Sequence, residues 1–98
     1  MAKESDLTKE ILNYLTSRKH FAFKHWGGMM GRRGVSDIIG TKYPGGLSFY
    51  LEVKLPGYDS KEVSQRLREQ QEFLFEAEGA GAITGIVCGI KDVEKLGL

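Results

Sequence analysis

Residues 35–54, VSDIIGTKYPGGLSFYLEVK, hold two apolar segments on either side of the turn YPGG. A short turn between two such segments predicts that they pair as neighbouring strands. Successive side chains of a strand point to opposite faces, so the second segment has two distinct sides. One side is apolar and carries Phe49, Leu51, Val53 and Leu55, whereas the other carries Tyr50, Glu52 and Lys54. Two charged side chains therefore lie side by side in an otherwise hydrophobic strand.

The rest of the chain alternates between helical and strand patterns. Apolar residues at helical spacing predict helices over residues 5–17 and 64–78, the second ended by Gly79 in the manner of a glycine C-cap. The other expected elements are strands over 20–26, 35–42, 47–54 and 82–90, loops over 27–34 and 56–63, and a short helix over 91–98. This order, α-β-β-β-α-β-α, predicts an α/β fold with a mixed β-sheet flanked by helices, in one domain spanning residues 1–98.

Composition excludes several classes of protein. The chain has 98 residues and one cysteine, Cys88, so it forms no internal disulfide, which fits a reducing compartment. The N-terminus does not have the pattern of a signal peptide, and no apolar run is long enough to span a membrane. The glycines of residues 79–85 follow a helix and precede a strand, which is the reverse of a dinucleotide-binding motif. We therefore expect a cytoplasmic protein with no membrane contact and no nucleotide cofactor.

Charge is unevenly distributed, although the net charge is only +1. No Asp or Glu occurs between Ile11 and Ser36, a stretch that contains Arg18, Lys19, His20, Lys24, His25, Arg32 and Arg33. A basic stretch of this kind is typical of a surface that binds phosphate groups. An ordinary solvated surface explains the charge equally well. The two histidines lack the paired ligand spacing of a zinc site.

Asp37 changes the meaning of the charged pair. An isolated Glu52 and Lys54 would be explained by the wet face of a strand. Asp37, however, begins the preceding strand, where an aspartate is disfavoured, and the hairpin folds it back against Glu52. Two carboxylates on neighbouring strands suit Mg²⁺, which prefers one or two carboxylates and keeps several waters. A lysine beside them can position water or neutralise charge on a phosphate.

These residues resemble a known nuclease core. The segments GVSDIIG and FYLEVK are similar to the D…ExK core of the PD-(D/E)xK nucleases, with Ser36 where that name has a proline. The longer pattern GVSDIIG…LEVK…QRLREQQEFL…EGAGAITGIV resembles the VRR-NUC branch of this superfamily, specifically its small stand-alone members of phages and bacteria. The resemblance spans nearly the whole chain and implies the PD-(D/E)xK fold.

The resemblance also implies roles for individual residues. Asp37 and Glu52 would hold the metal together with the carbonyl of Val53, and Lys54 would orient the attacking water. The family adds a glutamate from the first helix, for which Glu4 is preferred over Glu10 because Glu4 shares the inward stripe of Leu7 and Ile11. The family also places a glutamine on the helix after ExK. Both Gln70 and Gln71 qualify, and the spacing from Leu67 favours Gln71.

The implied activity is that of a Mg²⁺- or Mn²⁺-dependent DNA endonuclease, encoded by a bacterium or a phage. We expect Arg32, Arg33, Lys24, Arg66 and Arg68 to contact DNA. The small members of the family imply selectivity for branched DNA, with a homodimer that cuts four-way (Holliday) junctions. The alternatives are a monomeric flap or nick nuclease, a non-catalytic DNA-binding module on the same fold, and a restriction-type enzyme that reads bases.

Overall fold

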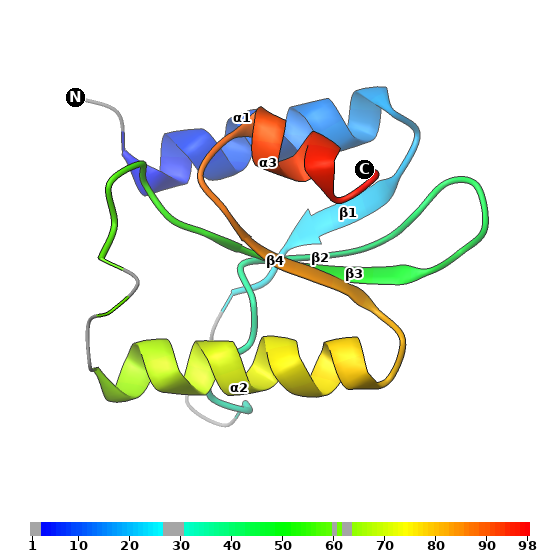
Figure 1. Ribbon diagram of the computed structural model, residues 1–98. Helices are drawn as coiled ribbons and strands as arrows, with labels where there is room; N and C mark the ends of the chain where they lie inside the picture. Colours follow the sequence, from blue (N-terminus) through cyan, green and yellow to red (C-terminus); the bar gives the residue numbers. More distant parts are fainter. Residues whose placement is uncertain (1–2, 27–30, 60, 62–63) are drawn as a thin grey trace.

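A computed structural model describes residues 3–26, 31–59, 61 and 64–98. Helices and strands follow one another in the order α-β-β-β-α-β-α (Figure 1). The elements are α1 (Glu4–Ser17), β1 (Phe21–Lys24), β2 (Ile38–Thr41), β3 (Ser48–Val53), α2 (Gln65–Gly79), β4 (Ile83–Val87) and α3 (Ile90–Lys95). The predicted α/β domain with a mixed sheet flanked by helices is therefore confirmed. Within these residues, no helix combines the length and the apolar character needed to cross a membrane.

The four strands form one sheet in the order β1-β2-β3-β4. The pairs β1–β2 and β2–β3 are antiparallel, which confirms the hairpin expected around YPGG, and β3–β4 is parallel. In this register Gly40 lies opposite Phe49 and Ile38 lies opposite Leu51. The central strand β3 is thus paired on both sides, which holds its side chains rigidly.

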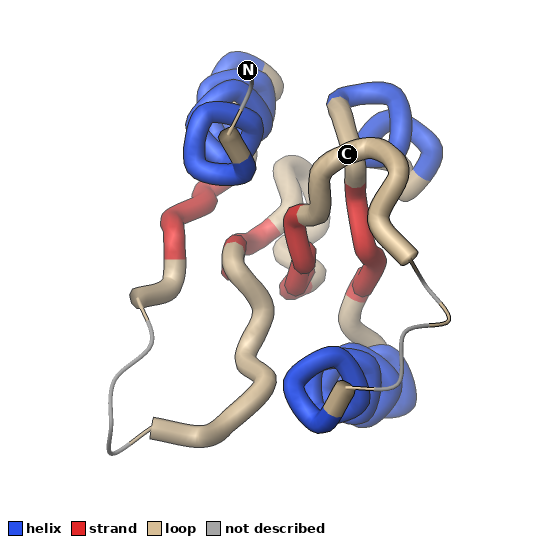
Figure 2. The backbone as a smooth tube through the Cα atoms, turned by 90° about the vertical axis from the view of Figure 1, so that its left-hand side faces the viewer, coloured by secondary structure: helices blue, strands red, loops and turns tan. Residues whose placement is uncertain are grey.

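Helices cover both faces of the sheet. Helices α1 and α3 lie on one face and α2 lies on the other (Figures 1 and 2). The apolar side of β3 packs under α1 and α3 in a core made of Ile11, Leu15, Ile38, Phe49, Leu51, Val53, Val87, Val93 and Leu98. On the opposite side α2 packs on β3 and β4, where Tyr50 contacts Phe73 with ring centroids 5.4 Å apart. Glu52 shares that second side and is covered as well.

The strands are shorter than predicted, and this places the charged residues at strand ends. β2 begins at Ile38 rather than Val35, so Asp37 lies just before it, and Lys54 lies just after β3. Main-chain pairing nevertheless continues past both ends. The N–H of His25 donates to the carbonyl of Asp37 at 2.7 Å, and the N–H of Lys54 donates to the carbonyl of Val87 at 3.0 Å. Both residues therefore keep strand-like rigidity.

Helix α2 ends one residue later than predicted, and the glycine that terminates it is Gly81 rather than Gly79. Gly79 is the last helical residue, Ala80 is the C-cap, and the left-handed conformation falls on Gly81, with a φ of 102°. The N–H of Gly81 donates to the carbonyl of Glu78 and that of Ala82 to the carbonyl of Ala77. Gly81 is required here because a side chain is disfavoured at positive φ, whereas Gly79 continues the helix.

Gly40 should be intolerant of any side chain. A Cβ at this position would overlap the ring of Phe49 and the carbonyl of Phe21. We expect Gly40→Ala to lower the free energy of unfolding by about 3 kcal/mol in urea denaturation, because the sheet cannot widen locally to accept a methyl group. Gly79→Ala is the matched control, since open space surrounds Gly79 and alanine favours helix. Equal stability of the two variants would contradict this prediction.

Candidate active site

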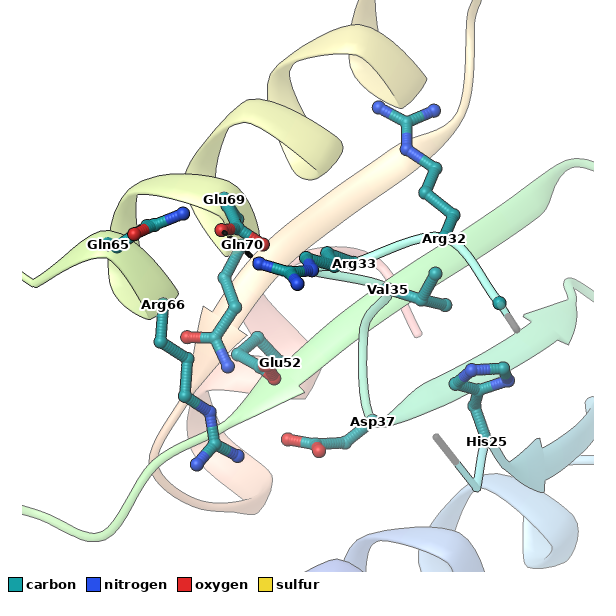
Figure 3. Close-up of a pocket in the computed structure, with 12 residues that line it drawn as sticks. His25, Arg32, Arg33, Val35, Asp37, Glu52, Gln65, Arg66, Glu69 and Gln70 are labelled. Carbon is teal, nitrogen blue, oxygen red and sulfur yellow. Dashed lines mark ion pairs between the residues drawn. The ribbon is translucent and has the colours of Figure 1, made fainter. Parts of the chain in front are cut away.

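The ends of β2 and β3 bring Asp37 and Glu52 together (Figure 3). The Oδ2 atom of Asp37 accepts a hydrogen bond of 2.8 Å from the N–H of Val53. The carbonyl of Asp37 accepts from His25, as described above. Asp37 is therefore fixed by main-chain groups on both of its sides, between β1 and β3, and its carboxylate is held toward Glu52. The predicted pairing of the two carboxylates is present.

Glu52 is a buried carboxyl group with only 1% of its surface exposed. Within the described part of the chain, neither of its carboxyl oxygens has a hydrogen-bond partner. Burial, and after it the carboxyl group of Asp37 beside it, raise the pKa of Glu52 to about 9. Lys54 opposes this shift and Glu4 adds to it. Such a group is costly to keep in a folded protein unless something binds to it.

Gln70, rather than Gln71, reaches this site. Leu67, Gln70 and Leu74 are the buried residues of α2, so they form its inward stripe at helical spacing. The side-chain oxygen of Gln70 is buried and, like the oxygens of Glu52, has no partner among the described residues. Gln71 is exposed and lies with Arg68 on the outer side of the helix. The preference for Gln71 is therefore corrected: one residue along a helix turns a side chain by about 100°.

Two adjoining cavities contain the predicted catalytic residues. Asp37 and Glu52 line a cavity of about 720 Å³. Lys54 and Glu4 line a smaller one of about 260 Å³. Gln70 and Arg66 border both cavities. Glu4, the first residue of α1, thus lies on the Lys54 side of the site rather than in the Asp37 cavity, and the remaining wall of the smaller cavity includes Tyr58 and Asp59.

The predicted DNA-binding residues divide into two groups. Arg32, Arg33 and Arg66 line the larger cavity, and Figure 3 shows them on its rim. Arg32 pairs with Glu76 and lies 5.2 Å from the Phe73 ring, and the Nη1 atom of Arg33 is 4.0 Å from Oε1 of Glu69. Arg68 lies outside the site, as noted above. Lys24 stacks on Trp26, with its Nζ 4.4 Å from the ring centroid, and does not line either cavity.

A close main-chain contact holds the arginine loop against α2. Gly34 has a φ of 78°, and a Cβ there would overlap the carbonyl of Glu69. Only glycine permits both the left-handed conformation and this approach. The loop that carries Arg32 and Arg33 is thereby held beside the helix that carries Arg66 and Gln70. The cavity is therefore lined by two segments that are distant in sequence, this loop and α2.

Three residues with polar side chains line the larger cavity but were not predicted as site residues: His25, Gln65 and Glu69. His25 carries a usable signal, because residues 21, 23 and 25 alternate along β1 and share one face of the sheet. Gln65 and Glu69 belong to the same side of α2 as Arg66 and Gln70, but nothing in the sequence shows which side of this helix covers the sheet end.

His20 and Cys88 have structural environments. His20 is buried, accepts at Nδ1 from the N–H of Tyr43 at 2.9 Å, and has its Nε2 3.2 Å from the carbonyl of Leu98, so it ties the chain end to the hairpin turn. Burial raises the pKa of the Cys88 thiol, and the carboxylate of Asp92 raises it further. A thiol kept protonated is a poor nucleophile.

The donor atoms of the site fit a hard divalent cation. The described residues contain no group of three or more His, Cys, Asp or Glu side chains placed to bind a metal. What they offer is two carboxylates, Asp37 and Glu52, and the unpartnered amide oxygen of Gln70. Oxygen donors with few carboxylates suit Mg²⁺ or Mn²⁺, since Mg²⁺ retains water in its remaining positions. The buried, unpartnered oxygens are the feature that such an ion would satisfy.

Comparisons with protein-family models, with curated proteins and with solved structures find no match for this chain. The resemblance to the VRR-NUC family therefore stays a prediction from sequence.

Proposed function

We propose that the chain is a metal-dependent DNA endonuclease of the PD-(D/E)xK type. The observation that carries the proposal is Glu52, a buried acid whose two oxygens lack partners in the described structure and lie beside Asp37 in a cavity. A strongly perturbed carboxyl group in a cavity is typical of a functional site. The arginines on the rim supply the charge that a phosphodiester requires.

Asp37, Glu52 and Gln70 would hold Mg²⁺ or Mn²⁺, and the carbonyl of Val53 is a further candidate ligand. The chemistry that this ion supplies is Lewis-acid activation of water and of the phosphodiester. The hydrogen bond from Val53 to Asp37 leaves the second oxygen of that carboxylate available to a ligand. The two strand ends keep both carboxylates in place before the ion arrives, which lowers the cost of assembling the site.

The other residues would bind and orient the DNA. Arg33 and Arg66 lie on the cavity rim and would contact phosphates flanking the scissile one. Lys54, half-buried in the adjoining cavity, presents an ammonium group whose three donors can orient the attacking water and stabilise the charge that develops on the phosphate. Glu4 lines the same cavity and would help to hold that water.

The substrate that we propose is branched DNA. The described helices α1, α2 and α3 all pack on the sheet, so none projects as a recognition helix for the major groove. Selectivity for DNA shape is the alternative to reading bases. A homodimer would place two sites on a symmetric four-way junction. A monomer would instead act on flaps or nicks.

The direct test uses an end-labelled four-way junction beside a flap and a linear duplex of matched sequence. Each is incubated with the protein and Mg²⁺ or Mn²⁺, with a chelator as control. We expect paired, symmetric cuts in the junction that require the metal. Equilibrium sedimentation showing only monomer, with and without DNA, would leave the flap or nick nuclease. No metal-dependent cutting of any substrate would leave a non-catalytic DNA-binding module.

Gln70 and Gln71 form a matched pair for testing the geometry. We expect Gln70→Ala to lower metal-dependent cleavage about 10- to 100-fold, as is typical when a group that supports a metal site is removed. Gln71→Ala removes the same side chain one residue away on the exposed side of α2, and should retain the wild-type rate. Cleavage rates measured across a Mg²⁺ titration separate an effect on metal affinity from one on the maximal rate. Equal losses in the two variants would contradict the assignment of Gln70.

A further inference from the structure

Strand β1 exposes two aromatic side chains on one face of the sheet. Phe21 is 66% exposed and Phe23 is 45% exposed, with their ring centroids 5.8 Å apart. In the register Phe23 lies opposite Ile39, which in turn lies opposite Tyr50. Both rings therefore belong to the face that α2 covers, but α2 packs on β3 and β4, at the other side of the sheet. Among the described residues, no helix packs on this part of the face.

The aromatic row leads into the candidate active site. Strand alternation places residue 25 on the same face as residues 21 and 23, and His25 lines the cavity that contains Asp37 and Glu52. Figure 3 shows His25 at the edge of this cavity. A polymer bound along β1 would therefore reach the edge of the cavity that contains the two carboxylates.

The charge around the row suits an anionic polymer. Residues 11–36 contain no Asp or Glu. At the site end of β1, Arg33 lines the same cavity as His25, and Lys19 lies at the other end with its Nζ 5.7 Å from the Tyr43 ring centroid. Lys24 pairs with Ile38 in the register and so belongs to the other face of the sheet. A second copy of this chain would bring the same cations against each other, which is unfavourable. Exposed aromatics flanked by cations are instead typical of surfaces that bind single-stranded nucleic acid.

We infer that Phe21 and Phe23 form a stacking platform for unpaired bases of the DNA strand that enters the active site. Stacking on aromatic rings tolerates any base, because every base has a π-face. A sheet surface that presents aromatic side chains to unstacked bases is an established way to bind single strands. The inference rests on the proposed nuclease function and deepens it, since it names a substrate with a single-stranded segment next to the scissile phosphate.

Binding measured without catalysis tests the platform. Fluorescence anisotropy would follow a labelled oligothymidylate of about 12 nucleotides, a length within the usual site size, and a duplex of equal length, both in chelator. We expect Phe21→Ala and Phe23→Ala each to weaken single-strand binding about tenfold and to leave duplex binding unchanged. Phe75→Ala is the matched control, because Phe75 is 80% exposed but lies on the outer side of α2 beside Arg68. It should bind like the wild type.

Two further measurements can overturn the inference. Phe21→Leu and Phe23→Leu keep an apolar side chain without a ring, so wild-type affinity in these variants would rule out stacking. If sedimentation shows a dimer that Phe23→Ala dissociates, with single-strand affinity unchanged, a second copy covers the row instead. Failure of the nuclease proposal is a separate result: no substrate would be cut, whereas the tenfold loss of binding in chelator would still be observed. If the alanine variants bind single strands like the wild type and cut junctions normally, the stacking platform is refuted and the nuclease proposal stands.

Discussion

Replacing Lys54 with alanine should lower metal-dependent cleavage about 100- to 1,000-fold while leaving DNA binding and folding nearly intact. Lys54 is held in place by its main chain, whose N–H donates to Val87, so removing the side chain does not disturb the strand end. What is lost is a cation beside the two carboxylates, where charge on the phosphate would develop. Single-turnover cleavage with excess enzyme measures this loss without interference from product release.

Lys24→Ala is the control for charge alone. It removes one positive charge from a residue that lies outside both cavities, so it should weaken DNA binding modestly and leave the single-turnover rate unchanged at saturation. Lys54→Arg should fail to restore activity, because a planar guanidinium is larger and presents its donors differently from an ammonium group. Wild-type cleavage by Lys54→Ala would refute the role of Lys54 and, with it, the central part of the nuclease proposal.

The central hairpin was predictable because two independent signals agreed on it. Alternation in residues 47–54 fixed which side chains of β3 face the core, and Phe49, Leu51 and Val53 are fully buried as expected. The turn YPGG fixed the pairing with β2. Once these strands are paired, Asp37 and Glu52 have to meet, so the carboxylate pair followed from local patterns alone.

The environment of Glu52 was not predictable in the same way. Its side of β3 carries Tyr50 and Lys54, a pattern that also fits a wet face. In the structure, α2 covers this side of β3, with Gln70 among its buried residues. Nothing in the sequence of β3 shows that a helix packs there. Gln71 was preferred for its spacing from Leu67, but which of the two glutamines meets the sheet depends on a difference of one residue in helical phase, which that spacing does not determine. The open part of the same face, at Phe21 and Phe23, likewise depends on how far α2 extends across the sheet.

Replacing Glu52 with glutamine should stabilise the metal-free protein, although it removes a residue of the proposed active site. Glutamine has nearly the same shape and is neutral at any pH, whereas Glu52, with a pKa of about 9, has to take up a proton to fold at pH 8. In chelator at pH 8 we expect the variant to unfold at a higher urea concentration, with a gain of about 1–3 kcal/mol, comparable to the gains seen when buried ion pairs are replaced by uncharged residues. Loss of cleavage combined with a gain in stability is the pattern expected of a functional residue that strains the fold.

The pH dependence of stability is an independent test of whether Glu52 destabilises the metal-free protein. The pKa of Glu52 is about 9 in the folded protein, against an ordinary value of 4.5. Between these values the folded state binds a proton that the unfolded chain releases, so the free energy of unfolding falls as the pH rises. This contribution is fully present below pH 4.5 and is lost as the pH approaches 9. Glu52→Gln should lack this slope, and Glu10→Gln, which changes an exposed acid of α1, should retain it.

Adding Mg²⁺ should abolish or reverse the difference in stability between the wild type and Glu52→Gln. An ion bound to the ionised carboxylates stabilises only the folded wild type, by about 2.7 kcal/mol at a concentration one hundred times its dissociation constant. The wild type should then become as stable as Glu52→Gln or more so, and its pH dependence should flatten, because the ion replaces the proton on Glu52. Urea denaturation from pH 6 to pH 9, with chelator or with Mg²⁺, measures all of these effects. If Glu52→Gln is the less stable protein in chelator at pH 8 and Mg²⁺ leaves the wild type unchanged, Glu52 is a structural carboxyl group and no ion binds there.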